Sequence, residues 1–271
     1  MQGASRDSLR AAIDRLDGLL GQTGVDPSDV GDQLFMVVDL LDQQAALRAS
    51  LTDPSRSGDD KAALVRALLA GKLREPVVEF VEGTVRSRWS ASRDLADTFD
   101  RLAAEAILTS AEQQGGLDSV EDELFRFSRL ATAEPTLRAA LTDRALPADR
   151  KADVVAMLLQ DKATPETVRL ATRTVTHPRG QAFEAGLAAL ADLAAARRQR
   201  LVATVTAAVP LTQAQRESLA GSLGRQFGHD LHLNVVVDPD VLGGLRVSLG
   251  DEMIDGSLAT RLEDARRRIV G

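Results

Sequence analysis

The glycines near the C-terminus are the first residues whose spacing could support chemistry. Gly243, Gly244, Gly250 and Gly256 lie close together in the sequence. A phosphate-binding loop needs the spacing G-x-x-x-x-G-K-[ST] or G-x-G-x-x-G, so that backbone amides surround the anion. Neither spacing occurs, and no lysine follows Lys162. We therefore interpret these residues as turn and close-packing glycines.

The three histidines form no recognisable metal-binding pattern. His229 and His232 read H-x-x-H, but residues three apart on a strand point to opposite faces, and no third ligand follows at a suitable spacing. His177 precedes Pro178 in a predicted interhelical turn, where we expect it to be solvated. Cysteine is absent, which excludes disulfides and thiolate chemistry. The sequence predicts no catalytic residue, no metal and no cofactor.

Other charged and aromatic residues have structural explanations. The acidic run Glu121 to Glu123 suits the N-terminal part of a helix, where it complements the helix dipole. Arg266 to Arg268 suit the last turn of a final helix for the same reason, with a functional cationic patch as the alternative. We expect Trp89 to be packed at a junction rather than exposed.

Charge and hydropathy exclude several classes of partner. The net charge is −7, of which residues 1–196 contribute −8 and residues 197–271 contribute +1. Bulk affinity for nucleic acid or an anionic membrane is not expected from this balance. No apolar run reaches the roughly 18 to 20 residues that span a bilayer. The N-terminus lacks a signal-peptide pattern, so we expect the protein to stay in the cytoplasm.

The chain contains an internal repeat with an offset of 90 residues. Residues 32–72 align with residues 122–162 without a gap, with 17 identities in 41 positions. The four lysines of the chain fall at two equivalent pairs, Lys61/Lys151 and Lys72/Lys162. This pattern indicates a duplicated unit.

Each copy has the pattern of short amphipathic helices. Leu64, Val65, Leu68 and Leu69 lie on one helical face, and the second copy repeats them at equivalent positions. We expect five or six helices in each copy, with the long stretch 93–114 at the junction. The predicted helix starts are Asp26-Pro27, Ser57 with Asp60, and Thr164-Pro165.

The pattern changes near residue 200 from helical spacing to alternation of apolar and polar residues. Thr212 and Gln215 form a capping box for a helix that stops near Gly228, and a last helix is predicted from Ser257. The predicted strands are 201–209, 231–237, 245–249 and 252–255.

These observations predict an α+β protein that is mostly α-helical. Two tandem, duplicated helical bundles precede a small C-terminal α/β domain. The predicted domains are an additional helical unit (1–95), a second helical unit (96–196) and the α/β domain (197–271).

The C-terminal residues resemble the signature of the delta subunit of F-type ATP synthases, whose mitochondrial counterpart is the oligomycin-sensitivity-conferring protein. That signature runs from an Asp-Pro pair through (L/I)GG, a strand and a hairpin turn to D-G-S and a helix with R-L. The matching residues are Asp238, Pro239, Leu242, Gly243, Gly244, Asp255, Gly256, Ser257, Arg261 and Leu262. The segments 112–124 and 205–215 are also similar, so residues 96–271 cover an ordinary member. Residues 1–95 are extra, as in long actinobacterial members. Ala103 stands where many members carry a tyrosine.

The resemblance implies a non-catalytic stator subunit at the cytoplasmic face of the cell membrane. In this family the helical domain binds N-terminal helices of the alpha subunits of the catalytic head. The C-terminal domain holds the b subunits of the peripheral stalk, so that the head resists rotary torque during proton-driven ATP synthesis. Membrane association is then expected only through the complex.

The head-binding groove is expected between two helices of the second copy. Its expected residues are Ala104, Ile107, Leu108, Ala111, Val168, Ala171 and Val175. An ordinary bundle core would use the same residues, so both interpretations stay open here. Two other functions also remain: a helical-repeat adaptor unrelated to ATP synthase, and a nucleotide-handling enzyme built on the α/β domain.

Overall fold

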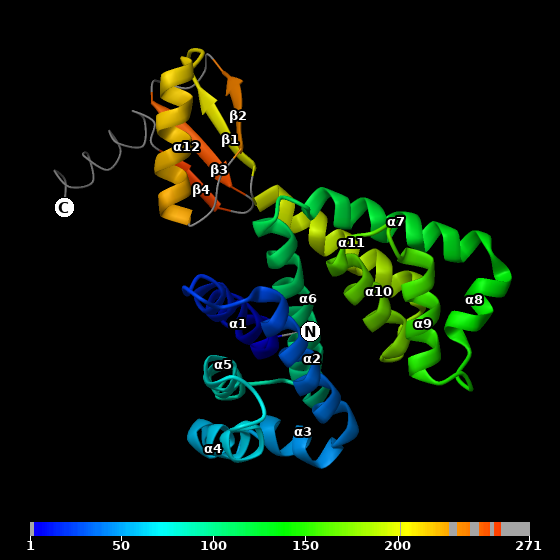
Figure 1. Cartoon of the computed structure of the whole chain (residues 1–271). Helices are drawn as coiled ribbons and strands as arrows, with labels where there is room; N and C mark the ends of the chain where they lie inside the picture. The colour runs from blue at the N-terminus through cyan, green and yellow to red at the C-terminus, as the bar shows by residue number, and fades with distance from the viewer. Residues whose placement is uncertain (1–2, 201, 228–231, 239–243, 250–251, 256–271) are drawn as a thin grey trace. The chain divides into compact units, whose positions relative to one another are not determined.

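The structure is a computed structural model of the whole chain, and it describes residues 3–200, 202–227, 232–238, 244–249 and 252–255. The chain divides into two compact units, residues 1–192 and 193–271. The predicted fold class is confirmed, because a long series of helices precedes a small sheet (Figure 1). In the part of the chain that is described, we find no helix with the length and apolar character needed to cross a membrane.

The helices of the chain before the sheet follow one another with short connections (Figure 1). They are α1 (Ala4–Leu20), α2 (Pro27–Gln43), α3 (Ala45–Thr52), α4 (Gly58–Leu69), α5 (Glu75–Val85), α6 (Ser92–Gln113), α7 (Leu117–Ala133), α8 (Pro135–Thr142), α9 (Ala148–Leu159), α10 (Pro165–Thr176) and α11 (Phe183–Arg200).

The duplication seen in the sequence is also present in the helices. The bounds of α2, α3 and α4 recur 90 residues later as α7, α8 and α9, and α10 starts 90 residues after α5. The equivalent lysines Lys61 and Lys151 are both buried. Helix α6 is shared, because it is the sixth helix of the first copy and the first helix of the second. The two copies therefore overlap in one helix rather than meeting at a linker.

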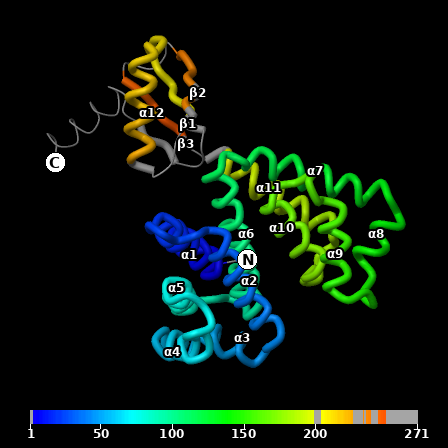
Figure 2. The backbone as a smooth tube through the Cα atoms, in the orientation of Figure 1, coloured from blue at the N-terminus to red at the C-terminus, as the bar shows by residue number. Residues whose placement is uncertain are grey.

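Helix α6 packs against helices of both copies. It contacts α1, α2 and α3 of the first copy and α7 and α10 of the second. Every residue from Leu102 to Ala111 is buried, including Glu105 and Ser110. The backbone tube in Figure 2 shows α6 running from the helices of the first copy to those of the second. Over this length α6 is enclosed by neighbouring helices of the same unit.

Local capping signals explain where several helices begin. Asp26 accepts a hydrogen bond from the backbone amide of Ser28 at 2.9 Å, and Pro27 occupies the first turn of α2. Ser57 caps α4 by accepting from the amide of Asp60 at 3.1 Å. Thr164 caps α10. Each bond satisfies a backbone amide that has no partner within its helix. The three predicted helix starts are therefore confirmed.

Helices α2 and α6 approach each other closely at Gly31. A Cβ atom on Gly31 would lie 2.6 Å from the Ile107 side chain and 3.0 Å from the Ala103 carbonyl oxygen. Ala103 is itself fully buried. Small residues at both positions allow the two helix backbones to come together, which a tyrosine at position 103 would prevent.

The second unit contains a four-stranded sheet with the strand order β2-β1-β3-β4. Strand β1 pairs in parallel with β2 and antiparallel with β3, and β3 pairs antiparallel with β4. Helix α12 connects the two parallel strands, as such a crossover requires. The elements are β1 (Val202–Ala207), α12 (Gln213–Phe227), β2 (His232–Val237), β3 (Leu245–Leu249) and β4 (Glu252–Asp255).

The core of the second unit lies between α12 and the sheet. Val205, Leu223 and Val247 are buried there. Thr212 and Gln215 form the predicted capping box, in which the backbone amide of Gln215 donates to the Thr212 hydroxyl at 3.3 Å. The four predicted strands are confirmed. The predicted last helix from Ser257 lies outside the described residues.

Candidate partner-binding surfaces

The residues expected to line a head-binding groove lie mostly in the interior of the first unit. Six of the seven are at most 4% exposed, and Val168 is half-buried. In this structure they hold helices together, which is the bundle-core interpretation left open by the sequence. The six are Ala104, Ile107, Leu108, Ala111, Ala171 and Val175.

Helix α2 of the first copy packs against α6, and its side chains contact arginines of α10. Besides the close contact at Gly31, Asp32 pairs with Arg169 at 3.5 Å and Asp39 pairs with Arg173 at 2.7 Å. The Arg173 guanidinium also lies 4.6 Å from the centroid of the Phe35 ring, within the range of a cation–π interaction. We call this contact between α2 and α10 the inter-copy seam.

Arg179 extends the seam beyond the end of α10. It pairs with Asp42 and, at 2.6 Å, with Asp97, and it lies 4.0 Å from Asp100. Its side chain is only 8% exposed, whereas the carboxylates that it pairs with are 36–41% exposed. Burial raises the pKa of Asp100, and the nearby Arg179 and Arg173 guanidinium groups oppose that shift. The seam therefore combines buried arginines, Arg173 and Arg179, with an exposed pair between Arg169 and Asp32.

His177 lies beside this network in the turn after α10, as predicted, and its side chain is 42% exposed. It ends α10, and its Nε2 atom lies 3.5 Å from Asp39. Burial lowers the pKa of His177, and the positive charge of Arg173 lowers it further, while Asp39 acts in the opposite direction. Its contact with Asp39 was not predicted, because α2 lies more than 130 residues earlier in the sequence.

The seam arginines were not among the residues singled out from the sequence. Arg169 and Arg173 are spaced by four on α10, and Asp32 and Asp39 by seven on α2, so each pair lies on one helical face. Two faces of opposite charge were thus visible in the sequence. Their pairing depends on tertiary packing, which helical periodicity does not specify.

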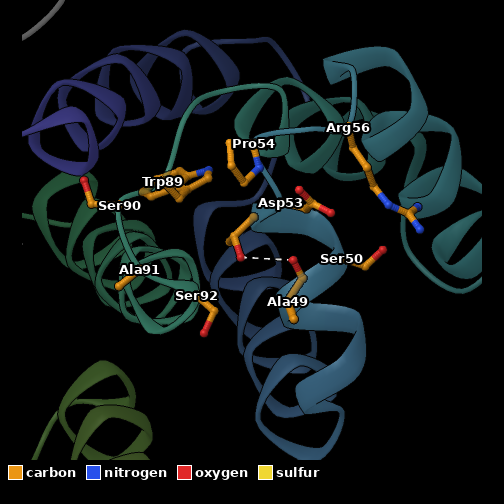
Figure 3. Close-up of a pocket in the computed structure, with 10 residues that line it drawn as sticks. Ala49, Ser50, Asp53, Pro54, Arg56, Trp89, Ser90, Ala91 and Ser92 are labelled. Atoms are coloured by element: carbon orange, nitrogen blue, oxygen red, sulfur yellow. Dashed lines mark hydrogen bonds between the residues drawn. The ribbon is translucent and has the colours of Figure 1, made fainter.

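A pocket of about 480 Å³ lies in the first copy, between the loop that follows α3 and the loop that precedes α6. Figure 3 shows the Trp89 ring extending toward Pro54 at this pocket. Trp89 is 7% exposed and belongs to the apolar core of the first copy. Asp53 already accepts hydrogen bonds from the amide and hydroxyl of Ser55, which lower its pKa. The pocket is therefore a structural feature of the loop packing.

Metal binding finds no support in the described part of the chain. There, no group of three or more His, Asp or Glu side chains is placed to hold an ion. His229 lies outside the described residues, so the H-x-x-H pair is not tested.

Three residues of the C-terminal signature are described, and each has a place in the sheet. The Asp238 amide donates to the Ala207 carbonyl at 2.9 Å, which ties the end of β2 to β1. Gly244 has a φ of +84°, a conformation that side chains other than glycine rarely adopt. Asp255 ends β4 opposite Arg246. The signature residues outside the described ranges are Pro239, Leu242, Gly243, Gly256, Ser257, Arg261 and Leu262.

The fold defines a class of protein: a duplicated helical bundle followed by a small α/β domain. The sequence profile of the ATP synthase delta (OSCP) subunit family matches residues 100–269. The chain is 51% identical to the ATP synthase subunit delta of Streptomyces coelicolor, over all of this chain and 98% of that one. The same subunit of Streptomyces avermitilis is 51% identical over 99% of this chain and 98% of its own length. That of Kineococcus radiotolerans is 48% identical over 99% and 98%.

This chain belongs to the ATP synthase delta (OSCP) subunit family. Its additional first copy is part of the match, because the relatives align over nearly their whole lengths. An adaptor unrelated to ATP synthase and a nucleotide-handling enzyme have no support in these matches.

Proposed function

We propose that this protein is the stator subunit that joins the catalytic head of an F-type ATP synthase to its peripheral stalk. It is a non-catalytic subunit, and its task is to keep the head from turning with the central rotor during ATP synthesis. The observation that carries the proposal is the full-length match to chains named ATP synthase subunit delta.

A stator must transmit torque without bending, and the helical unit is suited to that task. Helix α6 is continuous between the two copies and buried from Leu102 to Ala111. The inter-copy seam adds Arg173 and Arg179, whose side chains are 12% and 8% exposed. A hinge between the copies would have to break both the apolar packing of α6 and these ion pairs. Attachment of this rigid unit to the head and to the stalk is strong when several contacts bind at the same time.

The division of labour follows the predicted domains 1–95, 96–196 and 197–271. The second helical unit binds N-terminal helices of the alpha subunits, and the α/β domain binds the b subunits. The helices α6 and α10 form the head-binding region, in which the buried residues set the spacing of the helices. Of the seven residues expected to line the head-binding groove, Val168 is the half-buried one, so a partner helix reaches it directly.

The protein is a peripheral component of a membrane complex, and we place it at the cytoplasmic face of the cell membrane. Its attachment runs through the other subunits. The stalk-binding surface is the signature region of the α/β domain, which begins at Asp238 and includes Gly244 and Asp255.

A tagged full-length chain tests the proposal by co-purification from gently solubilised membranes. We expect the alpha and b subunits to be recovered together and identified by mass spectrometry. Val168→Glu should reduce recovery of the alpha subunits while retaining b. Met157→Glu is the matched control, because Met157 is 69% exposed on α9 of the same copy. Recovery of neither alpha nor b with the unmodified chain would refute the stator role.

A further inference from the structure

An exposed apolar side chain of the first copy lies at the edge of the inter-copy seam. On α2, Asp32, Met36 and Asp39 are spaced by four and three residues, so they share one face of the helix. Met36 is 55% exposed, although the aspartates on either side of it pair with arginines of α10. The contact between the two copies therefore leaves a large apolar side chain of α2 uncovered beside it.

Helix α10 has a matching row on its side of the seam. Val168 and Thr172 are four residues apart, and each directly precedes one of the seam arginines, Arg169 and Arg173. Both side chains are half-buried. The other flank of the arginines faces α6, since Glu166 on that flank accepts a hydrogen bond from α6 at 2.9 Å. Val168 and Thr172 therefore lie on the flank of the seam that faces away from α6.

The charged side chains between these two rows are paired. Asp32 pairs with Arg169 at 3.5 Å, and Asp39 pairs with Arg173 at 2.7 Å. Asp29, the preceding carboxylate on α2, pairs with an arginine of the first copy at 3.0 Å. A helix that lies along the seam then needs no charge of one particular sign, so the apolar side chains on its two flanks set the contact.

The head-binding region of the proposed function borders this surface. Six of the seven residues expected there are at most 4% exposed, so a partner helix reaches Val168 rather than α6. A helix is about 10–12 Å wide with its side chains, and packed helices lie about 8–10 Å apart. Since side chains of α2 and α10 are already in contact, a helix along the seam covers Val168 with one flank and Met36 with the other.

We propose that Met36 of the first copy and Val168 of the second copy form one docking surface for the amphipathic N-terminal helix of an alpha subunit. We call these two residues, with the ion pairs between them, the seam surface. The additional first copy then supplies one side of the head-binding surface. This inference rests on the proposed function for the identity of the partner, and on the exposure of Met36 and the two helix rows for the place where it binds.

Site-specific photo-crosslinking in the purified, assembled complex tests the contact. The crosslinking residue p-benzoylphenylalanine replaces Met36 in one variant. In the control variant it replaces Ala63, which is exposed on α4 of the same copy. We expect position 36 to crosslink to the N-terminal segment of an alpha subunit, identified by mass spectrometry, and position 63 not to do so. A crosslink from position 36 to a b subunit or to a second copy of this chain would overturn the proposal.

Peptide binding to the full-length chain measures what Met36 contributes. A fluorescently labelled peptide of the alpha-subunit N-terminal segment is titrated with the purified protein, and its anisotropy gives the Kd. Met36→Glu should raise the Kd about tenfold, because a carboxylate would replace the apolar contact. Met36→Leu and the control Ala63→Glu should keep the Kd within about twofold of wild type. Circular dichroism establishes that each variant is folded.

Val168→Glu separates the failure of this inference from the failure of the proposed function. If Val168→Glu weakens peptide binding but Met36→Glu does not, the seam surface is refuted and the head-binding role of the second copy stands. If the peptide does not bind the wild-type chain, or if neither variant weakens its binding, the head-binding region is wrong and the seam surface fails with it.

Discussion

Leucine substitutions at two helical glycines should change stability in opposite directions. Gly31 lies in α2 against α6, and a Cβ atom there would meet Ile107 at 2.6 Å and the Ala103 carbonyl at 3.0 Å. Gly18 lies in α1 with no heavy atom within 4 Å of its Cβ position. The two sites thus differ in the space around them, while both belong to helices of the first copy.

The expected magnitudes follow from two opposing effects. Replacing a helical glycine with leucine gains up to about 0.8 kcal/mol from helix propensity. At Gly18 this gain acts alone. At Gly31 the added carbons overfill a packed contact, which costs about 1–3 kcal/mol, so the variant should be less stable than the wild type. The propensity gain is common to both variants, so the difference between them is about 1–3 kcal/mol, or roughly 2–12 °C in melting temperature.

Thermal melts followed by circular dichroism at a helical wavelength provide the assay. The helices of the first unit dominate this signal, so the measurement reports on the packing of the two copies. Gly18→Leu controls for the effect of leucine on helix propensity. If Gly31→Leu melts at or above the wild-type temperature, the close contact between α2 and α6 is not as the structure has it.

Three further perturbations test the interior and the inter-copy seam. Leu108→Ala, in the buried part of α6, should cost about 2–5 kcal/mol in urea unfolding, and a loss below 1 kcal/mol would mean that this side chain is not enclosed. Arg173→Ala removes the closest ion pair of Asp39 and one of the two arginines near Asp100, so it should cost about 1–3 kcal/mol, with less of that loss in high salt. The pKa of His177 is lower in the folded chain than in the unfolded chain, where it has the ordinary value of about 6.5. Between these two pKa values the unfolded chain binds more protons than the folded chain. This residue should therefore make the free energy of unfolding fall as the pH drops from 6.5 toward the folded pKa. His177→Gln should flatten that part of the urea-midpoint profile, and an unaltered profile would exclude His177 as its source.

The parts of the fold that depend on neighbouring residues could be predicted from the sequence. Asp26-Pro27 and Thr164-Pro165 predicted helix starts because a capping side chain and a proline act within one turn. The gap-free repeat predicted the duplication. Alternation of apolar and polar residues predicted the sheet, because a half-buried strand has a period of two.

The parts that depend on distant residues could not be predicted. Helical periodicity gives the buried face of α6 but not the number of helices around it, so Ile107 and Leu108 suited a groove and a core equally. The inter-copy seam joins Asp39 to Arg173 across more than 130 residues. The contact of His177 with Asp39 was missed for the same reason. The position of each charged row was visible in the sequence, whereas its partner was decided by the packing of the whole unit.

Proton-driven ATP synthesis in inverted membrane vesicles tests the central claim most directly. Vesicles would be prepared from cells that lack this chain, and ATP synthesis would be measured before and after adding the purified full-length protein. The stator role predicts little ATP synthesis without the chain and recovery when it is added. ATP synthesis at the wild-type rate in vesicles without it would contradict the account.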